Sequence, residues 1–178
     1  MSNAIPHQSS IRTIALAVLF SLLTLNLTAC NKNTLGKQST LTEESLRKFY
    51  DAGLQAAAKR DAQGTCAQYA DSAEIRMIKF MQMRSEKTTQ SKAEFCRELE
   101  DAYGQLRAVN ATSSARLDIG DITIAADGKS ADVISKVTET IQIAGQGITS
   151  TSEQSDHIEL IEGKPLVTQT TIRITGAS

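Results

Sequence analysis

The chain has 178 residues, of which 40% are hydrophobic and 22% charged, and its formal net charge at pH 7 is −1. This length fits one domain plus a targeting segment, and the composition is too apolar for an intrinsically disordered chain. Aromatic residues make up only 4%, tryptophan is absent and basic residues do not exceed acidic ones, so we do not expect a protein that binds nucleic acid.

The chain begins with a segment that has the layout of a signal peptide. Residues 1–13 are polar and contain Arg12, the only charged side chain before Cys30. Residues 14–27 form an apolar run that is shorter than the roughly 20 residues a membrane-spanning helix needs, but matches the hydrophobic region of a signal peptide. Arg12 is one of the 19 basic residues of the chain, so the part after the leader contains 18 basic and all 20 acidic residues. Its formal net charge is therefore −2.

The segment Leu27-Thr28-Ala29-Cys30 resembles the lipobox of bacterial lipoproteins. The resemblance implies lipidation of the Cys30 thiol, removal of residues 1–29 as a signal peptide, and acylation of the new amine, as with palmitate. Several acyl chains exceed the two signals that stable membrane anchoring needs. The alternative is an ordinary signal peptide in which Cys30 is incidental.

Residues 30–41 are expected to form a lipidated tether, because they are polar and lack periodicity. Ten flexible residues span about 17 Å on average, which holds the following domain close to the membrane. Asn31, in place of Asp, resembles the outer-membrane address of enteric-type lipoproteins. The expected location is therefore the bacterial cell envelope, at the outer membrane facing the periplasm. Anchoring in the inner membrane is the alternative.

Two helices and a strand are predicted next. Residues 42–60 repeat apolar side chains such as Leu46, Phe49 and Tyr50 at helical spacing, behind Thr42 as an N-cap. A short helix is expected over residues 61–69. Residues 73–83 indicate a strand rich in methionine. Met77 is a candidate for an adaptable ligand pocket, with ordinary core packing as the alternative.

Residues 84–90 are polar and are expected to form a loop. The capping-box pattern of Ser91 and Glu94 then opens a helix. Cys66 and Cys96 are the two cysteines besides Cys30, and export to an oxidising compartment favours a disulfide between them. A metal site would lack ligands, because one histidine follows Cys30.

From residue 115 the pattern changes to an alternation of period two, interrupted by turn residues. Four long strands are predicted, with a β-bulge at Gly120 and Asp121, and with Leu166 and Ile172 sharing the buried face of the last strand. Strands in hairpin order form an antiparallel meander whose one face is covered by the preceding helices. The sequence therefore predicts an α+β fold.

This order of elements is similar to that of the nuclear-transport-factor-2-like, or cystatin-like, superfamily. Short sequence segments also resemble those of its small envelope members, namely Phe49-Tyr50, the turn Asp127-Gly128 and Glu162-Gly163-Lys164. The resemblance assigns residues 42–178 to a cone-shaped domain, whose curved sheet wraps a cavity closed by N-terminal helices. It implies no single activity, because such cones include isomerases, dehydratases, pocket binders and non-catalytic interaction modules. Some also pair through the open sheet face, so a homodimer is possible.

The candidate pocket residues are those whose parity or helix face points toward such a cavity. Asp156 has the inward parity of Ile158, which places His157 outward, and Glu139 shares the parity of Val137. Because the neighbours of Asp156 are polar, we expect a wet rim and an ordinary pKa there. The full candidate set is Tyr50, Met77, Tyr103, Glu139 and Asp156.

We expect a lipid-anchored envelope protein that binds a small apolar ligand or another envelope protein, without catalysis. No residue is assigned as catalytic, and no metal or cofactor is expected, because the sequence contains no nucleophile–base set, phosphate-binding glycine loop or paired metal ligands. One alternative is an isomerase- or dehydratase-like enzyme that uses a pocket carboxylate. Another is an immunity or inhibitor lipoprotein.

Overall fold

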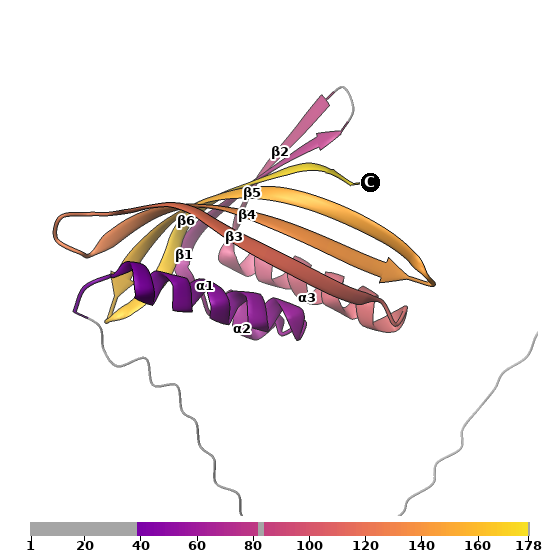
Figure 1. Cartoon of the computed structure of the whole chain (residues 1–178), viewed down its shortest axis with the longest axis horizontal. Coiled ribbons are helices and arrows are strands. Elements are labelled where there is room, and N and C mark those ends of the chain that lie inside the picture. Colours follow the sequence, from indigo (N-terminus) through magenta and orange to yellow (C-terminus); the bar gives the residue numbers. More distant parts are fainter. Residues whose placement is uncertain (1–38, 82–83, 178) are drawn as a thin grey trace, which may run out of the picture. The chain divides into compact units, whose positions relative to one another are not determined.

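The computed structural model describes residues 39–81 and 84–177. The predicted signal peptide, the lipobox with Cys30 and the tether up to residue 38 lie outside the described residues. Figure 1 shows helices below a long sheet that arches over them. The elements are α1 (Glu43–Ala58), α2 (Ala62–Cys66), β1 (Tyr69–Met81), β2 (Arg84–Ser91), α3 (Lys92–Ala108), β3 (Thr112–Ile124), β4 (Ser130–Ile143), β5 (Gln146–Ile161) and β6 (Lys164–Ala177).

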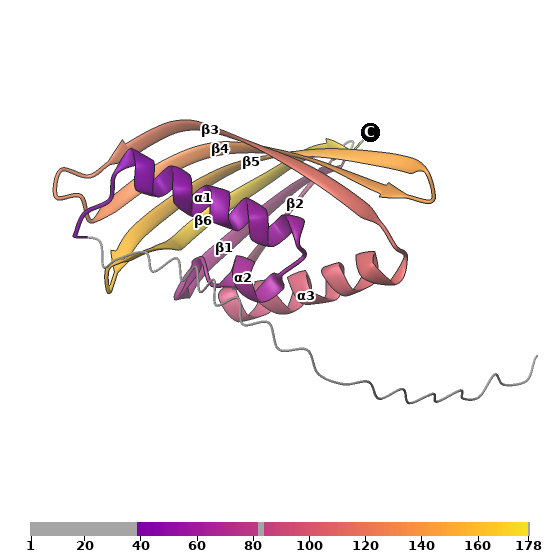
Figure 2. The same cartoon turned by 60° about the horizontal axis from the view of Figure 1, so that its bottom comes forward.

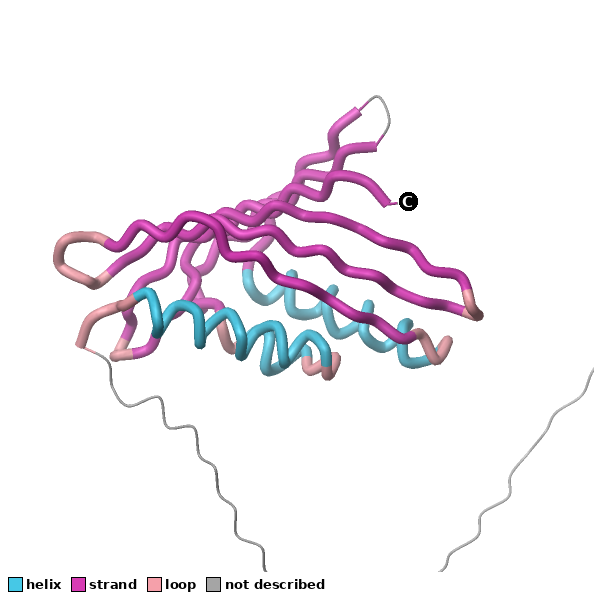
Figure 3. The backbone as a smooth tube through the Cα atoms, viewed as in Figure 1, coloured by secondary structure: helices cyan, strands magenta, loops and turns pink. Residues whose placement is uncertain are grey.

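The strands form one curved, unclosed sheet in the order β2-β1-β6-β5-β4-β3 (Figure 3). Strands β3 to β6 are the predicted antiparallel meander. The sheet is extended by β1, which pairs in parallel with β6, and by β2, which pairs antiparallel with β1. Figure 2 shows α1 lying across one face of this sheet, with α2 and α3 near one end of it. The α+β fold is confirmed.

The first helix begins at a capping box. The Thr42 side chain accepts a hydrogen bond from the Ser45 backbone, and the Ser45 hydroxyl accepts one from the Thr42 backbone. On the outer face, Arg47 pairs with Glu43 at 2.7 Å and Lys48 with Glu44 at 2.6 Å. Such exposed pairs four residues apart add only about 0.3–0.5 kcal/mol each. The position of α1 is therefore set by its buried face.

The core lies where α1 crosses the sheet. Leu46 of α1, Ile75 of β1, Val133 of β4 and Ile158 of β5 have no exposed surface. Burying one such aliphatic side chain contributes about 1.5–3 kcal/mol relative to leaving it in water. These four side chains belong to one cluster that holds α1 against β1, β4 and β5, and so fixes the shape of the space between helix and sheet.

The predicted disulfide between Cys66 and Cys96 is present, with 5.9 Å between the two Cα atoms. It joins α2 to the N-terminal part of α3, which begins at the predicted capping box of Ser91 and Glu94. None of the helices among the described residues combines the length and apolar character required to cross a membrane.

Three local expectations were wrong. Residues 84–90, expected to be a loop, belong to edge strand β2, which is polar throughout and pairs with β1. The second helix ends at Cys66, because Tyr69 already begins β1. On β6, an extra residue, Thr168, lies opposite the step from His157 to Ile158. This bulge turns Val167, which is 3% exposed, into the core in place of Leu166.

The bulge predicted at Gly120 is present, since the β3–β4 register shifts between Ile119 and Ile122. A Cβ atom at Gly120 would lie 3.2 Å from the Ile134 carbonyl oxygen, so glycine allows the two strands to approach here. The shift returns Ile122 and Ile124 to the buried face, where both pack against the core.

Candidate functional site

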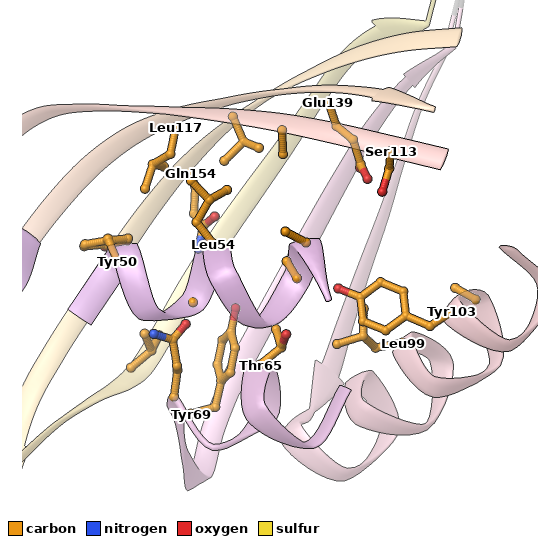
Figure 4. Close-up of a pocket in the computed structure, with 18 of the residues that line it drawn as sticks. Tyr50, Leu54, Thr65, Tyr69, Leu99, Tyr103, Ser113, Leu117, Glu139 and Gln154 are labelled. Carbon is orange, nitrogen blue, oxygen red and sulfur yellow. The ribbon is translucent and has the colours of Figure 1, made fainter. Parts of the chain in front are cut away.

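A cavity of about 390 Å³ lies between the sheet and the helices. Figure 4 shows Tyr50 and Leu54 of α1 and Leu99 and Tyr103 of α3 on the helical side, and Leu117 on the side of the sheet. This volume is in the range of small-molecule sites, which are typically apolar with a few polar groups. The apolar wall also includes Phe49, Ala57, Ala58, Ala102, Leu106, Ala115, Val137, Ile141 and Val167.

Asp156 is the most buried polar group of the cavity, with 2% of its surface exposed. The Tyr50 hydroxyl donates to its Oδ2 atom at 2.6 Å. The Gln154 side-chain nitrogen lies 3.0 Å from each carboxyl oxygen. Both oxygens of Asp156 are therefore held by neighbours on α1 and β5.

Burial raises the pKa of Asp156, while contacts with Thr170, Tyr50 and Gln154 act in the opposite direction. The Thr170 hydroxyl makes no hydrogen bond of good geometry, although it is buried opposite Asp156 on β6. The expectation of a wet rim with an ordinary pKa is thus wrong. The cause is α1, which covers this part of β5 and removes water from the inward side chain.

The tyrosines that line the cavity remain protonated donors at neutral pH. Burial raises the pKa of Tyr50 and of Tyr69, and the nearby Asp156 carboxyl raises both further. Tyr103 is half-buried on α3, and burial raises its pKa as well. Its hydroxyl points into the cavity beside Thr65 of α2 (Figure 4). The three hydroxyls thus belong to three different elements.

Glu139 is the second carboxyl of the wall. It lies on β4, is half-buried and extends beside Ser113 toward the helices (Figure 4). Within residues 39–81 and 84–177 its carboxylate forms no hydrogen bond or ion pair. Burial raises the pKa of Glu139, and the positive charge of Arg60 opposes this shift. Glu139 is therefore the carboxylate with free capacity for a ligand.

Four of the five candidate residues line this one cavity, namely Tyr50, Tyr103, Glu139 and Asp156. Met77 does not, because it is half-buried on β1 and packs against the core cluster. Gln154 was missed by sequence reasoning. Its signal was its position two residues before Asp156, which gives both side chains the same inward parity.

His157 faces the opposite side of the sheet. Its Nδ1 atom lies 2.7 Å from Oδ1 of Asp132, and its Nε2 atom lies 3.8 Å from Oε1 of Glu159. No histidine therefore shares the cavity with Asp156 among the described residues. In the same part of the chain, no three His, Cys, Asp or Glu side chains are grouped as ligands of a metal ion.

Solved structures share this architecture. A nuclear-transport-factor-2-like protein with a cystatin-like fold from Novosphingobium aromaticivorans matches with a TM-score of 0.55 and 12% identity, over 76% of this chain and 82% of its own. This decides the fold. The chain has a cystatin-like fold.

Two further proteins share the cystatin-like fold of this chain. A ketosteroid isomerase-like protein from Erwinia carotovora atroseptica has a TM-score of 0.54 and 15% identity, covering 76% of this chain and 99% of its own. ActVI-ORFA from Streptomyces coelicolor has a TM-score of 0.57 and 18% identity, covering 74% and 95%. No protein-family model and no curated protein sequence matches the chain. The likeness is therefore one of fold.

Proposed function

We propose that this domain binds a small, largely apolar molecule in the cavity between its helices and its sheet. The observation that carries the proposal is the apolar cavity of about 390 Å³ with two carboxyl groups on its wall. Protein interiors are normally packed with few voids larger than a water molecule. A space of this size, with polar groups fixed at defined places, is what a ligand site requires.

The packing of α3 supports the same proposal. This helix of 17 residues contains no fully buried side chain, although Leu99, Tyr103 and Leu106 face the cavity. A bound apolar molecule would cover these side chains, and each Å² of apolar surface removed from water contributes about 25 cal/mol. The ligand would thus complete the contact between α3 and the sheet.

We further propose that lipid attached to Cys30 holds the domain at the bacterial outer membrane, facing the periplasm. The support is the lipobox-like segment Leu27-Thr28-Ala29-Cys30 and the short polar segment before α1. A ligand-binding domain held there would capture molecules at the membrane surface.

An acid–base enzyme is the second candidate. The observation that favours it is Glu139, a half-buried cavity carboxyl without a partner in the described part of the chain, whose pKa is raised by burial. A general base works best when its pKa approaches the working pH. The binding role is the leading proposal because both oxygens of Asp156 are already engaged, which leaves Glu139, among the described residues, without a second free carboxyl group in the cavity to act as its acid–base partner.

A cavity-filling variant tests the binding proposal. Ala115 lies on the cavity side of β3, and Ser114 beside it is exposed on the other face. Titration with the neutral fluorescent dye Nile red should show binding to wild type and to Ser114→Trp, and at least about tenfold weaker binding to Ala115→Trp. Circular dichroism melting of each variant checks its folding.

Equal binding by a folded Ala115→Trp variant would contradict the proposal. The enzyme candidate makes a separate prediction, that the α-protons of a cyclic enone exchange with deuterium in heavy water. This exchange, followed by nuclear magnetic resonance, should disappear in Glu139→Gln. A binding module leaves the exchange rate at its value without protein.

A further inference from the structure

The charge on the cavity wall is of one sign. Its two ionisable acids are Glu139 and Asp156, and no Lys, Arg or His is among the described residues that line it. The remaining polar side chains are hydroxyls and amides. In a site of reduced dielectric, a carboxylate or phosphate on a ligand would meet like charge on the wall, with no cation among the described lining residues to compensate it.

The two acids differ in what they can offer a ligand. Asp156 is 2% exposed, and Tyr50 and Gln154 already bind its oxygens. Glu139 is half-buried and points into the cavity, and it has no hydrogen bond or ion pair within the described chain (Figure 4). The carboxylate of the cavity wall that is free to accept a hydrogen bond from a ligand is therefore that of Glu139.

Arg60 is the protein cation that acts on Glu139. Its guanidinium Nη2 donates to the backbone carbonyl of Ala111, which immediately precedes β3 and does not line the cavity. Arg60 and Glu139 form no direct ion pair. The positive charge of Arg60 thus favours the ionised form of Glu139 from a distance, and the carboxylate oxygens of Glu139 remain available.

We propose that the cavity selects molecules with an apolar body and a protonated amine, and that the Glu139 carboxylate receives the ammonium group. This inference rests on the proposed binding function and names the chemical class of its ligand. The apolar body would lie against Leu117 on the sheet side of the cavity and Leu99 on the helical side (Figure 4). Tyr103 adds an aromatic ring on the helical side, and aromatic rings attract cations through their faces.

The raised pKa of Glu139 agrees with this assignment. Burial without a contacting counter-charge raises the pKa of a carboxyl, and an ammonium group at hydrogen-bonding distance would lower it again. A charge-assisted hydrogen bond of this kind is roughly twice as strong as one between neutral groups. The charged pair therefore gives selectivity as well as affinity.

Three probes of one chain length test the inference, namely octylamine, octanol and octanoate. Isothermal titration calorimetry at neutral pH with the full domain should show that octylamine binds about tenfold more tightly than octanol, and that octanoate binds most weakly. Glu139→Gln should remove the preference for the amine. Asp132→Asn is the matched control, because it deletes an exposed carboxylate from the other face of the same strand.

The outcomes separate the two proposals. If octanol binds as tightly as octylamine, or the amine preference survives in Glu139→Gln, the amine inference is overturned while binding in the cavity stands. If none of the three probes binds, or Ala115→Trp leaves their binding unchanged, the proposed function itself fails. An amine preference that is lost in Glu139→Gln and kept in Asp132→Asn supports both.

Discussion

The hydroxyl of Tyr50 lies 2.6 Å from Oδ2 of Asp156, a contact between residues 106 positions apart in the chain. It joins α1 to the middle of the sheet at the edge of the cavity. Because Tyr50 is 7% exposed and Asp156 2% exposed, the Tyr50 hydroxyl depends on Asp156 for its hydrogen bond, and Asp156 depends on Tyr50 and Gln154. The pair therefore connects the stability of the domain with the shape of the proposed ligand site.

Removing the hydroxyl tests this connection. Tyr50→Phe leaves the buried Asp156 carboxyl without its α1 partner, and such a loss costs about 1–3 kcal/mol of unfolding free energy. Urea denaturation followed by circular dichroism measures it. Tyr103→Phe serves as the control, since the half-buried Tyr103 hydroxyl faces the cavity, where water can replace it. Its loss should stay within about 0.5 kcal/mol, and equal losses in both variants would refute the special role of the Tyr50 contact.

The pH dependence of stability should report on Asp156. Burial raises its pKa in the folded state, so the folded protein binds this proton more tightly than the unfolded chain, where the pKa of Asp is about 3.9. The stabilisation by the protonated form is complete below that value and is lost as the pH rises through the folded-state pKa.

The variant Asp156→Asn cannot lose that proton. Relative to wild type, its unfolding free energy should therefore increase as the pH is raised from about 4 to 8, because wild type loses a contribution that the variant never had. Denaturation series on both proteins over this range give the difference. A constant difference at all pH values would mean that the pKa of Asp156 is the same in both states.

Lipidation makes a prediction about mass and location. In a bacterial host, the full chain should yield a mature protein that begins at Cys30 and carries acyl chains, detectable by intact-mass spectrometry and by fractionation with the membranes. Cys30→Ser should abolish the added mass and release the domain into the soluble fraction, as loss of several acyl chains removes the anchor. A wild-type protein cleaved elsewhere and recovered without lipid would contradict the proposal.

The sequence predicted which side chains of β5 point into the cavity, but not how deeply they are buried. Alternation along β5 placed Asp156 inward and His157 outward, because side-chain parity is a local property. It did not indicate that Asp156 would be buried, since α1 covers it through contacts that depend on the whole fold. The polar pattern of the neighbouring residues was therefore misleading.

The same reasoning explains the errors in the sheet. Residues 85–91 of β2 are polar and none of them is fully buried, so the strand has no apolar alternation by which the sequence could identify it. On β6 one bulged residue, Thr168, exchanges Leu166 for Val167 in the core. A shift of one position reverses the faces of a strand, and nothing in the apolar pattern of β6 marks where it occurs.

The disulfide between Cys66 and Cys96 should support the cavity as well as the fold. It closes a loop of 30 residues, for which the chain-entropy relation gives about 3 to 4 kcal/mol. The double variant Cys66→Ala, Cys96→Ala should lose about this amount in urea denaturation. Because Thr65 and Leu99 lie beside the two cysteines and line the cavity, the variant should also bind Nile red more weakly under conditions where it remains folded. Reduction of wild type should reproduce both effects, and unchanged dye binding in the folded, reduced protein would show that α3 keeps its place without the bond.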